Sequence, residues 1–232
     1  MRGPAEPAQS FRVICAHGAD LTDWIAPTRT ALLIIDMQVD FAAPDGALGR
    51  AGLDLSGVPN ALAAAGRLAR AARGADVPVL FAALRTQAGT DSPVWRERVR
   101  RRGGDPDFAM ALCRLASPGA TFIGPLPEPG EMVIAKTRYS AFFRTDLDSE
   151  LRATGVDTLV VCGLTTESCV DSTVRDAFHL DYHVFLAGDA CAAYGEDLHA
   201  AALKSLELNC AILVTADEIV RTWEEDRLPA VL

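Results

Sequence analysis

Short apolar runs alternate with helix-like segments along the chain, and this alternation constrains the fold more than any other feature. The clearest run, Ala31-Leu-Leu-Ile-Ile-Asp36, is apolar until it ends in a carboxylate. A strand buried on both faces of a parallel sheet has this pattern, whereas a strand with one solvated face alternates apolar and polar residues. Repeated β-α units of this kind predict an α/β fold with right-handed crossovers.

The remaining elements follow in the same order. We expect strands at 31–36, 77–83, 132–135, 158–162, 182–187 and 210–214, and helices at 60–73, 145–155, 168–180, 197–208 and from 215 onward. Thr215 and Glu218 form a capping box at the start of the last helix. The sequence therefore predicts a single Rossmann-like domain, with a six-stranded, mostly parallel sheet and helices on both faces.

Residues 86–129 interrupt the alternation. This segment contains proline, glycine and polar residues around one expected helix. Sites in such folds lie beyond the carboxyl ends of the strands, so we expect the insertion to wall the site. It carries five arginines between Arg96 and Arg102. A solvated helix end is the simplest interpretation, and a subunit contact or a steering patch for an anionic substrate are the alternatives.

Charge and hydropathy limit the partners and the compartment. The 232 residues carry a formal net charge of -9, which disfavours binding to nucleic acid or to an anionic membrane. Apolar runs stay far below the roughly 20 residues of a membrane span, and residues 1–10 lack the apolar core of a signal peptide. We therefore expect a cytoplasmic protein with reduced cysteines at positions 15, 113, 162, 169, 191 and 210.

Three reactive side chains follow expected strands. Asp36 ends the first strand, Lys136 ends the third, and Cys169 follows the fourth after a short turn. Singly, each has an ordinary interpretation as a cap, a solvated cation or a small buried residue. Because the carboxyl ends of parallel strands share one edge, we expect the three to converge there.

That combination supplies the parts of a nucleophilic hydrolase. A thiol at a helix start is favoured as thiolate by the helix dipole, and a neighbouring ammonium is expected to lower its pKa further. A carboxylate in reach takes the thiol proton and later returns it to a leaving amine.

The same residues lie in three motifs that resemble those of the isochorismatase-like cysteine hydrolases. The motifs are Leu33-Ile-Ile-Asp36-Met-Gln38, Lys136-Thr-Arg-Tyr-Ser-Ala-Phe142 and Gly163-Leu-Thr-Thr-Glu-Ser-Cys169-Val170. Thr173, Asp176-Ala177 and Asp189-Ala190 also match the pattern. The resemblance implies a hydrolase domain over residues 30–232, preceded by an N-terminal extension over residues 1–29.

The resemblance also implies roles for single residues. Asp36 would be the base, Lys136 would stabilise the thiolate and the intermediate, and Cys169 would be the nucleophile. A cis peptide is implied at Leu164–Thr165, with the backbone N–H groups of Thr165 and Cys169 as the oxyanion hole. A homodimer or homotetramer is implied as well, and the helix after Cys169 and the Arg96–Arg102 stretch are the expected contact regions.

Around Arg138–Phe143 and Thr173–Phe178 the resemblance is closest to the ureidoacrylate and N-carbamoylsarcosine type of amidohydrolase. It implies hydrolysis of a small amide, ureido or carbamoyl C–N bond through a thioester intermediate, without a cofactor. Metal-dependent nicotinamidases of the superfamily have a histidine pair after the second strand. Residues 84–91 contain no histidine, so we expect no metal.

Two other functions stay open on the sequence alone. One is isochorismatase-type cleavage of a vinyl ether, which proceeds by protonation and needs no cysteine. The other is a non-catalytic member that binds a ligand or a partner protein. The substrate pocket is expected to involve Phe41, Tyr139, Phe142 and Phe143. His179 and His183 have the spacing of a helical metal pair, but the span crosses a helix end, which favours a structural role.

Overall fold

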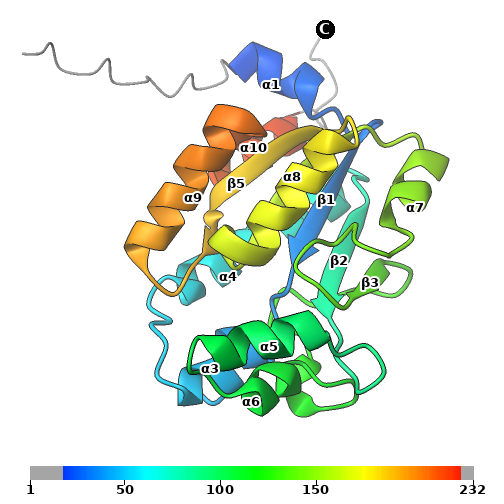
Figure 1. The fold of residues 1–232 in the computed structure, drawn as a ribbon. Helices are drawn as coiled ribbons and strands as arrows, with labels where there is room; N and C mark the ends of the chain where they lie inside the picture. The colour runs from blue at the N-terminus through cyan, green and yellow to red at the C-terminus, as the bar shows by residue number, and fades with distance from the viewer. Residues whose placement is uncertain (1–17, 226–232) are drawn as a thin grey trace, which may run out of the picture.

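The computed structural model describes residues 18–225, so Cys15 and most of the expected N-terminal extension lie outside the described range (Figure 1). Within this range the strands are β1 (Thr30–Ile35), β2 (Val79–Leu84), β3 (Met132–Lys136), β4 (Thr158–Leu164), β5 (His183–Ala192) and β6 (Ile212–Val214). They form one sheet in the order β3-β2-β1-β4-β5-β6. Every neighbouring pair is parallel, which confirms the predicted α/β sheet.

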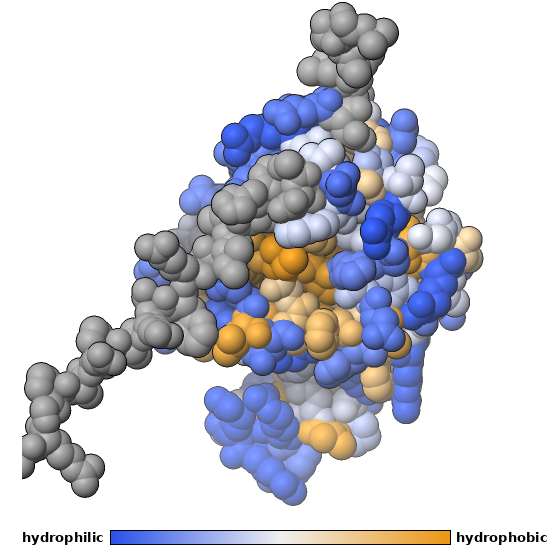
Figure 2. Space-filling view, turned by 90° about the horizontal axis from the view of Figure 1, so that it is seen from above, coloured by the Kyte–Doolittle hydropathy of each residue, from blue (hydrophilic) through white to orange (hydrophobic). Residues whose placement is uncertain are grey.

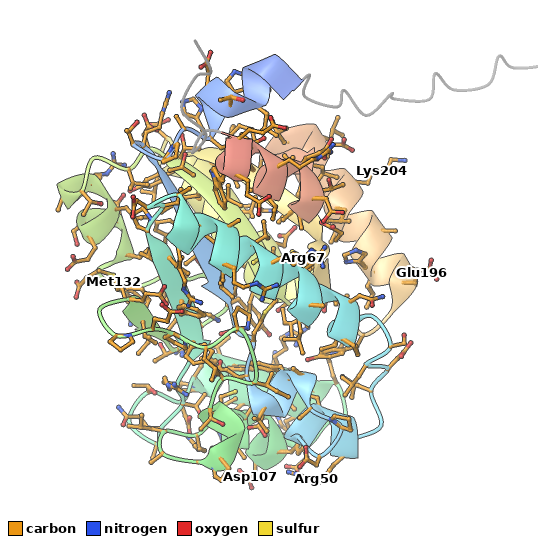
Figure 3. The ribbon with its side chains drawn as sticks, turned by 180° about the vertical axis from the view of Figure 1, so that it is seen from behind. Arg50, Arg67, Asp107, Met132, Glu196 and Lys204 are labelled. Atoms are coloured by element: carbon orange, nitrogen blue, oxygen red, sulfur yellow. The ribbon has the colours of Figure 1, made fainter. Side chains whose placement is uncertain are left out.

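Helices cover both faces of this sheet. Helices α4 (Val58–Gly74) and α10 (Ala216–Glu225) pack together on one face, as Figure 3 shows from behind. The opposite face carries α7 (Leu147–Ala153), α8 (Asp171–His179) and α9 (Glu196–Asn209). Small buried residues on α4, including Ala61, Ala65 and Ala72, let its backbone approach the sheet closely.

A second group of short elements lies beyond the carboxyl ends of the strands, at the bottom of Figure 1. It consists of α2 (Val39–Ala42), α3 (Ala47–Arg50), α5 (Pro93–Arg101), α6 (Pro106–Ala111) and the 3₁₀ turn η1 (Pro118–Ala120). The insertion therefore holds two helices and a turn where we expected one helix. Each helix has its own start signal, a proline in the first turn behind a capping Ser92 or Asp105.

The central strands β1 and β4 approach each other closely at their carboxyl ends. Gly163 has φ +137°, and a Cβ atom at this position would lie 2.2 Å from the carbonyl oxygen of Ile35. Only glycine fits both the dihedral angle and the contact. This tight pairing brings the residues after β1 and after β4 next to each other.

The opposite, amino-terminal edge of the sheet is closed by α1 (Gly18–Trp24). Leu21 and Ile25 are buried, and the indole N–H of Trp223 donates to the Ile25 carbonyl at 3.0 Å. Beside α1 lies a cavity of about 510 Å³, and Figure 2 shows hydrophobic surface gathered on this face. None of the helices within residues 18–225 has the length and apolar character that crossing a membrane requires.

Candidate active site

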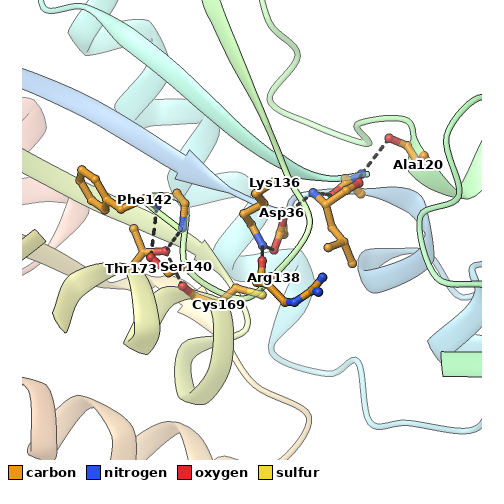
Figure 4. A network of polar contacts seen from close by, with 11 residues as sticks. Asp36, Ala120, Lys136, Arg138, Ser140, Phe142, Cys169 and Thr173 are labelled. Carbon is orange, nitrogen blue, oxygen red and sulfur yellow. Dashed lines mark hydrogen bonds and ion pairs between the residues drawn. The ribbon is translucent and has the colours of Figure 1, made fainter. Parts of the chain in front are cut away.

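Asp36, Lys136 and Cys169 meet at the carboxyl edge of the sheet (Figure 4). Asp36 directly follows β1 and adopts φ +51°, a left-handed conformation that aspartate tolerates better than most residues. Lys136 is the last residue of β3. Cys169 lies on η2 (Thr166–Val170), a single π-helical turn between β4 and α8. The expected helix 168–180 is therefore two elements, with the thiol in the first.

The ammonium of Lys136 connects the cluster. Its Nζ lies 2.6 Å from Oδ2 of Asp36 and 3.4 Å from Sγ of Cys169. A third contact goes to the carbonyl of Arg138 at 3.0 Å. An ammonium has three donors, so these contacts use all of them. Asp36 and Lys136 are both 0% exposed, so the ion pair is shielded from solvent.

Gln38 and Leu84 hold the carboxylate of Asp36 in place. The backbone N–H of Leu84 donates to Oδ1 of Asp36 and to Oε1 of Gln38, both at 2.8 Å. The amide of Gln38 donates in turn to the carbonyls of Leu84 and Ala120, at 3.0 and 2.8 Å. The other carboxylate oxygen remains directed at Lys136.

Thr173 fixes the nucleophile turn. Its hydroxyl donates to the Cys169 carbonyl at 2.7 Å and accepts from the N–H of Ala141 at 3.0 Å. This ties the turn to the loop that follows Lys136. The peptide bond between Leu164 and Thr165 is cis, at the position that the resemblance implied. The roles of the Thr165 and Cys169 N–H groups as oxyanion donors stay a prediction.

Burial dominates the electrostatics of the cluster. Burial raises the pKa of the Cys169 thiol, the charge of Asp36 raises it further, and Lys136 only partly offsets them. For Lys136, burial lowers the pKa, but Asp36 and Cys169 outweigh it, and the ammonium stays charged. Lys136 lowers the thiol pKa as expected, but the net shift is upward, because the thiol is buried against a carboxylate. A neutral thiol beside a charged acceptor favours proton transfer coupled to attack on a substrate.

The four expected pocket residues separate into two groups. Tyr139 contacts Trp95 of the insertion with ring centroids 5.7 Å apart, and the carbonyl of Phe41 accepts a hydrogen bond from the Tyr194 hydroxyl at 2.9 Å. Phe142 packs against Tyr182, and in Figure 4 it points away from the Cys169 thiol. Phe143 is exposed and lies under the Arg144 guanidinium. Phe41 packs against the small buried cluster that includes Leu84, whose N–H donates to Asp36, and the charges of Lys136 and Cys169 act on Tyr139. Phe41 and Tyr139 therefore stay pocket candidates, whereas Phe142 and Phe143 make their ring contacts elsewhere.

Two residues near the cluster are absent from the sequence-based expectation. Burial raises the pKa of the Tyr194 phenol, and the charges of Glu167 and Cys169 raise it further. Tyr194 follows the end of β5, which is longer than expected from its apolar run. Glu167 lies inside the third motif, where a charged residue in a turn after a buried strand is a usable signal.

Of the other cysteines, Cys113 packs in the small buried cluster that includes Leu84, next to Asp36, while the rest belong to other parts of the fold. Cys113, Cys162, Cys191 and Cys210 are free thiols, and burial is the largest cause of the raised pKa of Cys162 and Cys191. Residues 18–225 contain no group of three or more histidine, cysteine or acidic side chains placed to hold a metal ion.

Comparison with known proteins places this geometry in a family. The isochorismatase domain model matches residues 30–218. The chain is 40% identical over 193 residues to the ureidoacrylate amidohydrolase RutB of Methylobacterium radiotolerans, which covers 78% of this chain and 74% of the relative. The RutB protein of Variovorax paradoxus is 35% identical, over 84% of this chain and 81% of its own length.

Solved structures of related proteins support the same family assignment. A cysteine hydrolase from Pseudomonas syringae pv. phaseolicola superposes with a TM-score of 0.75 at 29% identity, over 87% of this chain and 95% of that chain. An isochorismatase family protein from Desulfovibrio vulgaris gives a TM-score of 0.71 at 32% identity, over 85% and 99% of the two chains. The chain therefore belongs to the isochorismatase family.

Proposed function

We propose that this protein hydrolyses a small ureido or carbamoyl compound at a C–N bond, with Cys169 as nucleophile, Asp36 as base and Lys136 as the stabilising cation. The observation that carries the proposal is the buried cluster itself, in which one ammonium contacts both the carboxylate and the thiol. Isochorismatase-type proton transfer would need no thiol at this position.

The geometry supports a two-step reaction. Sγ of Cys169 attacks the carbonyl carbon while Asp36 takes the thiol proton, and the backbone N–H groups of Thr165 and Cys169 bind the oxyanion. Asp36 then gives the proton to the leaving nitrogen, and the C–N bond breaks to leave a thioester. Water attacks the thioester, its proton passes to Asp36, and the acid is released as the thiol re-forms. Lys136 stays charged throughout and offsets the negative charge of the cluster.

The substrate class comes from the relatives. The RutB proteins described above are ureidoacrylate amidohydrolases, and a ureido group presents the planar carbonyl that this reaction requires. Two of the expected pocket residues, Tyr139 and Phe41, would line the pocket beside the ureido group. We also propose a cytoplasmic location and a homo-oligomer, on the basis of the free thiols within residues 18–225 and the apolar face beside α1.

Ammonia release from a panel of ureido, carbamoyl and simple amide compounds tests the proposal. Cys169→Ala and Cys169→Ser should abolish turnover while the circular dichroism spectrum and Tm stay near those of the wild type. Cys210→Ser, at a partly exposed thiol that contacts Arg175, is the matched control and should keep full activity. Wild-type turnover by Cys169→Ala would exclude the covalent route.

A further inference from the structure

Glu167 presents a buried carboxylate oxygen close to the nucleophile. It lies two residues before Cys169 on the same turn. Its Oε1 accepts a hydrogen bond from the Thr165 hydroxyl at 2.9 Å. Its Oε2 has no surface open to solvent and no hydrogen-bond donor within residues 18–225. A buried carboxylate oxygen without a donor is costly and uncommon in folded proteins, so it points to a donor that arrives from elsewhere.

The charge of Glu167 acts on two tyrosines that the charge of the thiol also affects. Burial raises the pKa of Tyr139, and the charges of both Cys169 and Glu167 act on its hydroxyl. The same two charges act on Tyr194. Glu167 and Cys169 thus lie on one turn, and their charges act on the same two tyrosines.

The nearby histidine does not satisfy the free oxygen. Nδ1 of His199 pairs with the hydroxyl of Thr166 at 2.8 Å. Burial lowers the pKa of His199, and the charge of Glu167 only partly opposes this, so the imidazole is neutral near pH 7. Glu167 thus retains an acceptor without a positive partner, which suits a neutral N–H donor.

We propose that Glu167 is a positioning residue that accepts a hydrogen bond from the substrate N–H on the non-leaving side of the scissile carbonyl. The inference rests on the proposed function and narrows its substrate class. A ureido group has nitrogen on both sides of the carbonyl, so one N–H can be held while the other nitrogen leaves. A simple amide has carbon on that side and gives Glu167 no donor.

A pair of substrates that differ by one group tests this. N-carbamoyl-β-alanine and glutaramate share the carboxylate, the terminal amide and the chain length, but one has N–H where the other has CH₂. The wild type should favour the ureido compound in kcat/KM. Glu167→Met should remove about 10- to 100-fold of this preference, the range of one hydrogen bond to a charged group, and should change glutaramate turnover much less.

Two further variants distinguish substrate recognition by Glu167 from a role in supporting the turn. Glu167→Gln keeps a carbonyl acceptor of the same reach and should restore part of the preference. Glu196→Met, at an exposed glutamate at the start of α9, should leave both substrates unchanged. Equal losses on both substrates in Glu167→Met would show that Glu167 only supports the turn, and would overturn the inference.

Binding provides a readout that does not depend on turnover. In a Cys169→Ala background, calorimetry should show tighter binding of N-carbamoyl-β-alanine than of glutaramate, and Glu167→Met should abolish the difference. If the wild type hydrolyses no compound of the ureido and carbamoyl panel but this binding difference persists, the proposed function fails and the role of Glu167 stands. Equal binding of the two compounds, or no binding of either, overturns the role of Glu167.

Discussion

The thiol of Cys169 lies between an ammonium and a carboxylate that shift its pKa in opposite directions. Burial and Asp36 prevail, so the resting thiol is protonated near neutral pH. In the proposed mechanism, the carboxylate that serves as base therefore also keeps the thiol from ionising before a substrate arrives. Removing the charge of Asp36 or that of Lys136 should therefore change the alkylation rate of Cys169 in opposite directions.

Alkylation by iodoacetamide against pH tests this balance. Asp36→Asn removes the charge that raises the thiol pKa and leaves Lys136, so thiolate should form at lower pH and alkylation near pH 8 should be faster. Each unit of pKa changes the thiolate fraction about tenfold below the pKa. Amide turnover should nevertheless be lost in Asp36→Asn, because the proton acceptor is gone.

Lys136→Met should act in the opposite direction. Without the ammonium the thiol pKa rises further, and alkylation near neutral pH should slow below the wild-type rate. The rate measured in Cys169→Ala gives the contribution of the other cysteines and is subtracted. Slower alkylation in Asp36→Asn than in the wild type would contradict the assigned directions.

Sequence reasoning predicted which three side chains converge but not the state of the thiol. Asp36, Lys136 and Cys169 could be found because strand ends and motif spacing are local features. The pKa of Cys169 depends on burial and on a carboxylate 133 positions away in the chain. Phe142 was misplaced for a related reason, since the sequence cannot show which side of a loop faces the pocket.

At the scale of secondary structure, the contact between β1 and β4 depends on one glycine. Gly163→Ala combines an unfavourable φ with a clash against the Ile35 carbonyl and should cost about 3 kcal/mol or more in the free energy of unfolding. Gly155→Ala is the matched control. It also has positive φ but open space around a new Cβ, so about 1–2 kcal/mol is expected. Urea denaturation measures both, and equal losses would show that the close approach is unimportant.

Helix α5 carries an exposed cation, Arg98, whose charge acts on Tyr139. Arg98 lies one turn after Trp95, which contacts Tyr139, and its charge lowers the pKa of that tyrosine against the effect of burial. The neighbouring arginines differ, since Arg96 pairs with Asp107, and Arg100 and Arg101 pair with Glu97. Among the described residues no ion pair joins Arg98 to a carboxylate. This favours the steering interpretation for Arg98 and a solvated helix end for the others.

Arg98→Ala should therefore weaken the use of substrates that carry a carboxylate. We expect KM to rise about three- to tenfold at low salt, as for a partly screened charge pair, and kcat to change little. Arg101→Ala removes an arginine of the same helix and should have no effect. Steady-state kinetics at low and high ionic strength check this, and a salt-independent change in KM would argue for a structural role.

Hydrophobic periodicity located most helices and strands but gave several of their ends wrongly. β5 continues to Ala192, and its pairing with β4 shifts register between Val161 and Gly163. The apolar run stops earlier, at the polar Asp189, whose carboxylate accepts the N–H of Ala216. The capping box of Thr215 and Glu218 was correct because both of its hydrogen bonds are local, and both are present.

At the scale of the whole molecule, we propose the amino-terminal face as the contact between subunits; of the two expected contact regions, only the helix after Cys169 contributes to it, through Phe178. Trp24, Phe178, Leu208 and Ile212 are exposed there and line the cavity beside α1. Exposed apolar clusters of this kind are typical of association sites. Phe178→Glu should shift the mass measured by light scattering toward the monomer. Leu126→Glu, at an exposed leucine that does not line this cavity, should not. A monomeric wild type at micromolar concentration would contradict the expected oligomer.

The burial of Cys169 also has a consequence for chemical damage. Peroxide oxidises thiolates far faster than thiols, so the folded protein protects its own nucleophile. In an unfolded chain the same cysteine is solvated and its pKa returns to the ordinary range. Oxidants in the cell should therefore inactivate newly made or heat-loosened chains before mature ones. Substrate or product that stabilises the fold should preserve activity under peroxide, even at concentrations too low to compete for the thiol.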